Sequence, residues 1–145
     1  MTTDTAKEFG GRRAIVNHLI ALGLWELALI VYTCIKDPHV GVIFLVFVQI
    51  NTIVVVYSIV LMSAIYICGR RAGTEILNNS DGYLKTGLKY ALVISLVTLI
   101  PFMVIWYAVD SNILWPALFI TGTMAAVWLI TVRQISGRIA SEMES

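Results

Sequence analysis

Four long apolar runs, separated by short polar segments, constrain the fold of this chain more than any other feature. They cover residues 14–35, 40–68, 90–109 and 112–132. A helix needs ~20 residues to cross the ~30 Å hydrocarbon core of a bilayer, and each run reaches that length. Backbone groups in lipid have no water to bind, so a run that crosses it must be helical. The sequence therefore predicts an all-α membrane protein with four transmembrane helices.

The amino-acid composition supports the same prediction. The chain has 145 residues, of which 59% are hydrophobic, and its formal net charge is +1. Ordinary soluble domains contain roughly 45–50% apolar residues, and a domain of this size leaves much of its surface exposed. A net charge near zero gives no basic field for nucleic acid. We therefore expect the partners to be a lipid bilayer and other membrane subunits or further copies of the chain, with no nucleic acid.

Basic residues predict the orientation of the helices. Nine of the ten lie in the two terminal segments and in the connection between the second and third runs, and only Lys36 lies in the first short turn. Such an excess is typical of the inner side of a membrane. The pattern predicts an integral protein of the plasma or inner membrane with both termini cytoplasmic. Its parts would be a polar tail at 1–13, a four-helix domain at 14–135 and a second tail at 136–145.

The connection between the second and third runs contains one strong turn signal, Asn-Asn-Ser-Asp-Gly at 78–82. The polar segments on either side, 70–77 and 83–89, contain no proline. We expect helices 2 and 3 to extend through them and to form a hairpin that projects from the inner face.

Each apolar run carries polar residues near its middle, where an ionisable or amide side chain is costly in lipid. Counted from the run ends, these residues reach a similar depth in all four predicted helices. The shared depth predicts one ion or proton site, or one helix-packing site, formed by Glu26, Gln49, Asn51, Thr52, Thr98 and Thr121.

Glu26 supports two interpretations, which the sequence does not separate. In the first, burial favours the protonated acid near neutral pH, and the side chain loads and releases a proton or cation. In the second, the protonated acid donates a hydrogen bond to Gln49 or Thr52 and fixes the register of two helices. Threonine and serine on helices often bond to their own backbone, which favours a structural role for the other polar residues.

Two smaller groups of residues predict ligands. His18 lies about one turn inside the first run and would ligate a haem only together with a partner subunit, although a solvated or interfacial histidine fits the same position and is favoured. The basic residues that flank the middle connection would attract anionic lipid headgroups at about 1 kcal/mol per charge, although a topology signal alone produces the same pattern. These residues are Arg70, Arg71, Lys85 and Lys89.

No catalytic motif and no metal-ligand spacing occur in the sequence, which favours a non-catalytic protein over an enzyme and predicts no catalytic or metal site. No cofactor is predicted, with haem or quinone as the alternatives. The first hypothesis is an accessory or assembly subunit of a larger membrane complex. The second is a small homo-oligomeric transporter or channel coupled to protons or ions through Glu26. The third is a haem- or quinone-associated anchor that uses His18.

Overall fold

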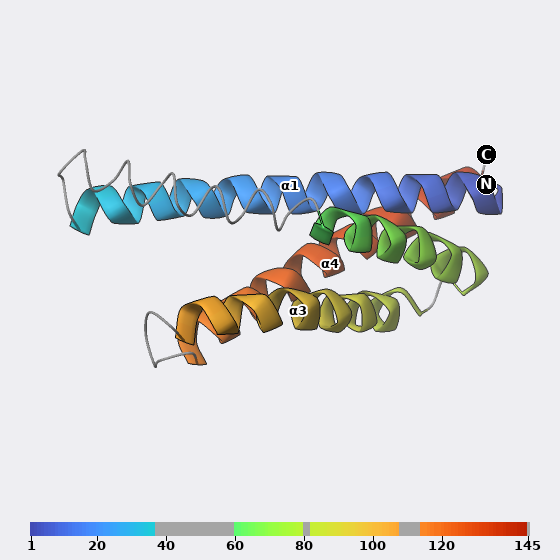
Figure 1. The fold of residues 1–145 in the computed structure, drawn as a ribbon. Coiled ribbons are helices and arrows are strands. Elements are labelled where there is room, and N and C mark those ends of the chain that lie inside the picture. The colour runs from blue at the N-terminus through green and yellow to red at the C-terminus, as the bar shows by residue number, and fades with distance from the viewer. Residues whose placement is uncertain (37–59, 80–81, 108–113, 145) are drawn as a thin grey trace.

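The computed structural model describes residues 1–36, 60–79, 82–107 and 114–144. These residues form α1 (Thr3–Lys36), a helical segment at 60–78, α3 (Tyr83–Tyr107) and α4 (Leu114–Met143). The described part of the chain contains no strand, so the all-α part of the prediction is confirmed. Helix α1 runs along the length of the molecule and α3 lies below it, whereas α4 begins beside α3 and rises behind α1 toward the C-terminus (Figure 1). Both ends of the chain lie at the same end of the molecule.

The prediction of four transmembrane helices is contradicted. Among the described residues, no helix is both long enough and apolar enough to cross a bilayer. The integral-membrane localisation, the inside position of the termini, the inner-face hairpin and transport across a bilayer lose their basis with it. Run length alone does not identify a membrane span, because an apolar run can contain polar residues. Asn17 and Thr131 are examples, and they hydrogen-bond to each other between α1 and α4. Residues 40–59 of the second run lie outside the described residues.

Helical structure continues through both segments that the sequence predicts as polar tails. Helix α1 begins at Thr3 and α4 ends at Met143. Oppositely charged side chains one turn apart support each end, and such pairs contribute about 0.2–0.5 kcal/mol each. The pairs are Lys7 with Asp4 at 3.3 Å, Arg12 with Glu8 at 3.7 Å, and Arg138 with Glu142 at 2.9 Å.

Small residues allow α1 and the 60–78 helix to touch backbone to backbone. A methyl group at Gly69 would lie 2.5 Å from the carbonyl oxygen of Gly10 and 2.7 Å from the Cβ of Ala14. A methyl group at Gly10 would meet the Gly69 carbonyl oxygen, and one at Gly73 would meet the carbonyl oxygen of Ala6. Only glycine permits such an approach. The spacing of four residues along both helices therefore determines where they cross.

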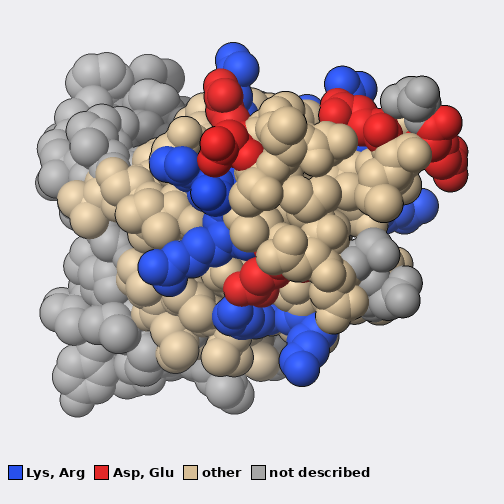
Figure 2. Space-filling model, turned by 90° about the vertical axis from the view of Figure 1, so that its right-hand side faces the viewer, with Lys and Arg blue, Asp and Glu red and all other residues tan. Residues whose placement is uncertain are grey.

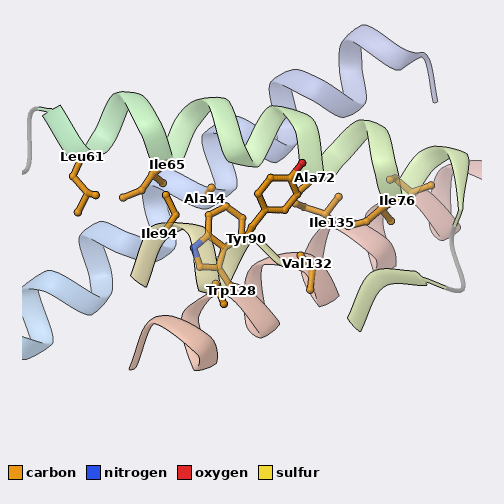
Figure 3. Packing of buried hydrophobic residues seen from close by; sticks show 12 residues of the cluster. Ala14, Leu61, Ile65, Ala72, Ile76, Tyr90, Ile94, Trp128, Val132 and Ile135 are labelled. Carbon is orange, nitrogen blue, oxygen red and sulfur yellow. The ribbon is translucent and has the colours of Figure 1, made fainter. Parts of the chain in front are cut away.

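The hydrophobic core lies where all four helical segments meet. Figure 3 shows Leu61 and Ile65 of the 60–78 helix above Ile94 of α3 and Trp128 of α4. Trp128 is fully buried, and its ring centroid lies 5.7 Å from that of Tyr90. Helix α4 packs against both α3 and α1. The complete cluster comprises Ala14, Leu61, Ile65, Ala72, Ile76, Tyr90, Ala91, Ile94, Trp128, Val132, Ile135 and Ile139.

The described residues on the two sides of the connection from the 60–78 helix to α3 are joined by backbone hydrogen bonds. The amide of Asn79 donates to the carbonyl of Glu75 at 3.0 Å, and the amide of Gly82 donates to the carbonyl of Asn79 at 3.2 Å. Helix α3 begins at the next residue, Tyr83. The turn brings Glu75 beside Lys89 and Tyr90, fourteen and fifteen residues later in the chain.

Candidate functional site

Polar side chains join α1 to α4 along one side of the core. The side-chain Nδ2 of Asn17 donates to the Thr131 hydroxyl and to the side-chain Oε1 of Gln134, both at 2.9 Å. The Nε of Arg13 donates to the same Gln134 oxygen at 2.7 Å. Asn17 and Thr131 are buried, where an unpaired polar group costs about 1–3 kcal/mol. Thr131 also donates to the Val127 carbonyl of its own helix at 2.7 Å, so a shift of either helix leaves the buried Asn17 amide without its partners. This cost holds the two helices in one register.

His18 extends this polar contact into the core. Its Nδ1 lies 2.8 Å from the carbonyl oxygen of Ala14, one turn earlier in α1. A carbonyl only accepts, so Nδ1 carries the proton and Nε2 is the acceptor of a neutral ring. The ring lies edge-on to Trp128, with 5.5 Å between centroids. Burial lowers the pKa of His18 by more than the hydrogen bond to Ala14 raises it, so the ring is held neutral.

Three buried polar atoms in this core have no hydrogen-bond partner among the described protein groups. They are Nε2 of His18, Oγ of Ser95 and Nε1 of Trp128, which come from α1, α3 and α4. The side chains are at most 4% exposed. A neutral imidazole whose other nitrogen is oriented by a backbone carbonyl has the form that metal-ligating histidines adopt. The described residues, however, contain no group of three or more His, Cys, Asp or Glu that could hold a metal ion.

The neutral state of His18 predicts a pH-dependent stability. The unfolded histidine has a pKa of about 6.5, and burial lowers the pKa in the folded chain. Below about pH 6.5 the unfolded chain therefore binds a proton that the folded chain does not, so acidification destabilises the fold. We expect the free energy of unfolding to fall by at most about 1.4 kcal/mol per pH unit, and to level off below the folded pKa.

Urea unfolding followed by circular dichroism, from about pH 7.5 to about pH 5, measures this dependence. His18→Phe should remove the slope, whereas His39→Gln, which changes the other histidine of the sequence, should retain it. A slope that survives in His18→Phe and disappears in His39→Gln contradicts the assignment. The Glu75 carboxylate does not interfere, because its pKa lies below its ordinary value of 4.5.

Glu75 is the centre of a second polar contact, at the outer end of the core. Its Oε1 accepts hydrogen bonds from Nζ of Lys89 at 2.6 Å and from the hydroxyl of Tyr90 at 2.8 Å. Partial burial raises the pKa of Glu75, but these hydrogen bonds outweigh it and the net shift is downward. Burial and the nearby carboxylate raise the pKa of Tyr90. Lys89 also lies 5.0 Å above the Tyr90 ring. The three groups therefore join the end of the 60–78 helix to the start of α3.

The predicted mid-helix site is only partly described. Thr98 donates to the carbonyl of Ile94 at 2.7 Å and Thr121 to that of Ala117 at 2.8 Å, so both hydroxyls bond to their own helix. Glu26 lies in α1, but its side chain is outside the described part of the structure, as are residues 49, 51 and 52. A joint site of these six residues stays a prediction.

The predicted headgroup residues separate into two groups. Arg70 and Arg71 line a hollow together with Lys7 of α1, a residue that the prediction did not include. Lys89 instead pairs with Glu75, and Lys85 lies exposed on α3. Binding of a headgroup stays a prediction, but the structure shows that Arg70 and Arg71 converge with Lys7.

Sequence reasoning missed the contact formed by Arg13, Asn17, Thr131 and Gln134. A signal was present, because Arg13 and Asn17 are four residues apart and Thr131 and Gln134 are three apart, so each pair lies on one helix face. What one sequence lacks is the information that these two faces meet.

No family model, curated protein or solved structure matches this chain.

Proposed function

We propose that this chain is a non-catalytic accessory or assembly subunit of a larger complex, which binds a helix of a partner subunit on the outer face of α3. The supporting observation is a row of leucines one helical turn apart. Their exposed fractions are 54%, 57%, 64% and 52% for Leu84, Leu88, Leu92 and Leu96 respectively. Contiguous apolar patches on a protein surface mark interaction sites.

The opposite face of α3 is already used by the chain itself. Tyr90, Ala91 and Ile94 of this helix are buried in the core. Helix α3 is thus apolar on both sides, a property of helices that are buried on both sides. One side has its neighbour within the chain, and the leucine row needs a second neighbour.

The sequence of α3 indicates the chemistry of that neighbour. Its only charged residues are Lys85 and Lys89, both near its start, and no charge follows as far as Tyr107. Lys89 is paired with Glu75. An apolar helix with a carboxylate opposite Lys85 would complement both the leucine row and its basic end.

The first experiment is a purification of the tagged chain from its native source, followed by native mass spectrometry of what elutes. We expect stoichiometric foreign subunits. Leu88→Asn with Leu92→Asn should release them, because burial of each leucine contributes about 1.5–3 kcal/mol and their joint loss weakens binding about 100-fold or more. Ile130→Asn is the matched control, since Ile130 is 53% exposed on α4, and it should retain the partners.

Circular dichroism should show the same helix content in all three proteins. A chain that elutes alone or only with copies of itself contradicts the proposal. So does a double variant that keeps its partners.

A further inference from the structure

A hollow of about 230 Å³ lies between the start of α1 and residues 67–74 of the 60–78 helix. It is lined by Lys7, Ile67, Arg70, Arg71 and Thr74. Three of these five side chains are cationic and none is acidic. Pockets for drug-sized ligands measure roughly 300–1,000 Å³, so this hollow suits one small charged group.

The glycine crossing positions these residues. Gly73 lies against the carbonyl of Ala6, and a Cβ at Gly73 would be 3.5 Å from the backbone nitrogen of Lys7. Lys7 is thereby placed next to the turn of the 60–78 helix that carries Arg70 and Thr74. Thr74 follows Arg70 by one turn, and its hydroxyl lies 3.2 Å from the Arg70 carbonyl. The basic side chains from two distant parts of the sequence converge because of the backbone contact.

The cations at this hollow keep most of their charge available. Among the described residues, no carboxylate lies within 4.0 Å of Arg70 or Arg71. The guanidinium of Arg70 lies 5.8 Å above the Tyr66 ring, which restrains the side chain without neutralising it. Lys7 pairs with Asp4 at 3.3 Å, but the Asp4 side chain is 93% exposed, and such surface pairs are weak.

The wider surface at this end of the molecule carries charges of both signs. Figure 2 shows Lys and Arg side chains across the face, with Asp and Glu side chains between and beside them. Attraction of an anion is therefore assigned to the cations of the hollow itself rather than to a field of the whole face.

We propose that this hollow binds a phosphate group, carried either by a small phosphorylated molecule or by a lipid headgroup. Two guanidinium groups offer paired N–H donors that match phosphate oxygens, and the lysine adds a point charge. This site is separate from the leucine row of α3, so it does not depend on the accessory role.

The test is calorimetric titration of the full chain with inorganic phosphate and with glycerol 3-phosphate, at ionic strength held constant with chloride. We expect saturable binding to one site. Arg70→Gln with Arg71→Gln should weaken it at least about tenfold, the effect of losing a hydrogen bond to a charged group. Lys85→Gln with Arg133→Gln removes the same charge outside the hollow and should change the affinity less than about twofold. Thr74→Val keeps the charge and, because the Thr74 hydroxyl already donates to the Arg70 carbonyl, should change the affinity far less than the double arginine variant.

Vesicle sedimentation separates the two sources of phosphate. The probes are phosphatidylcholine vesicles with and without phosphatidic acid. Sedimentation only with phosphatidic acid, lost in the double arginine variant, assigns the hollow to a headgroup. Saturable binding of inorganic phosphate or glycerol 3-phosphate without vesicle sedimentation assigns the hollow to a small phosphorylated molecule. Absence of binding in both assays, or equal weakening by the two double variants when circular dichroism shows both to be folded, overturns the proposal.

Discussion

Replacing Gly69 with leucine should destabilise the fold by at least about 3 kcal/mol. At this position even a methyl group would lie 2.5 Å from the carbonyl oxygen of Gly10. The obstacle is backbone, which does not rotate away as a side chain does, so α1 and the 60–78 helix must separate. Their separation exposes to solvent Ala14 and Ile65, both of which are fully buried in the folded chain.

Gly137→Ala is the matched control for this effect. Gly137 lies exposed on α4, and a methyl group there would meet nothing within 4 Å. Because alanine favours a helix over glycine, this variant should be more stable than the parent by about 0.5–1 kcal/mol. Urea unfolding followed by far-ultraviolet circular dichroism compares the two variants. A Gly69→Leu chain within about 0.5 kcal/mol of the parent contradicts the backbone contact.

The helices themselves were accessible from the sequence. The Asn-Asn-Ser-Asp-Gly signal predicted a turn, and α3 begins at Tyr83, directly after it. The helical ends at 3–13 and 133–143 carried a weaker signal. Acidic and basic residues stand three or four apart there, as Glu8 and Arg12 do, and this spacing supports a solvent-exposed helix. Glycines 10 and 11 act against it in an isolated helix, but Gly10 packs against Gly69 and Gly73, and Gly11 packs against Tyr66 and Arg70.

The arrangement of the helices was not accessible in the same way. Run length made four apolar segments look like spans, because it does not distinguish the faces of a helix. In the structure Trp128 and Val132 fill the core, whereas Ile130 between them is exposed. Which residues meet across helices depends on tertiary contacts, and a single sequence carries no record of the pairing of Asn17 with Thr131.

For the candidate sites too, the sequence indicates which residues are notable but not which residues they contact. Counting residues from run ends predicts one level for Thr98 and Thr121, and each hydroxyl bonds to a carbonyl of its own helix, as the structural interpretation of these residues expects. Whether they share a site with Glu26 stays a prediction. The sequence offers His18 as a haem ligand shared with a partner subunit or as a solvated histidine, but it does not reveal that the ring is buried against Trp128. The basic hollow needed the crossing of two helices before Lys7 could join Arg70.

Trp128→Ala should cost about 3–5 kcal/mol of stability, the range for removal of a large buried aromatic side chain. Trp128 is fully buried and its ring meets both His18 of α1 and Tyr90 of α3. Its loss opens a cavity between three helices at once. Because a fold of ordinary stability has only about 5–15 kcal/mol to lose, part of the variant should be unfolded at modest concentrations of urea.

Trp128→Phe separates packing from polarity at this position. Phenylalanine keeps a ring against His18 and Tyr90 and removes an Nε1 donor that has no described protein partner. A buried donor without a partner costs about 1–3 kcal/mol, so its removal offsets much of the lost volume. We therefore expect Trp128→Phe to lie within about 1.5 kcal/mol of the parent. Urea unfolding compares the two variants, using the same slope of the free energy of unfolding against urea concentration for both. If phenylalanine is as damaging as alanine, Nε1 is satisfied in the folded protein, and the indole nitrogen rather than the ring is what the core requires.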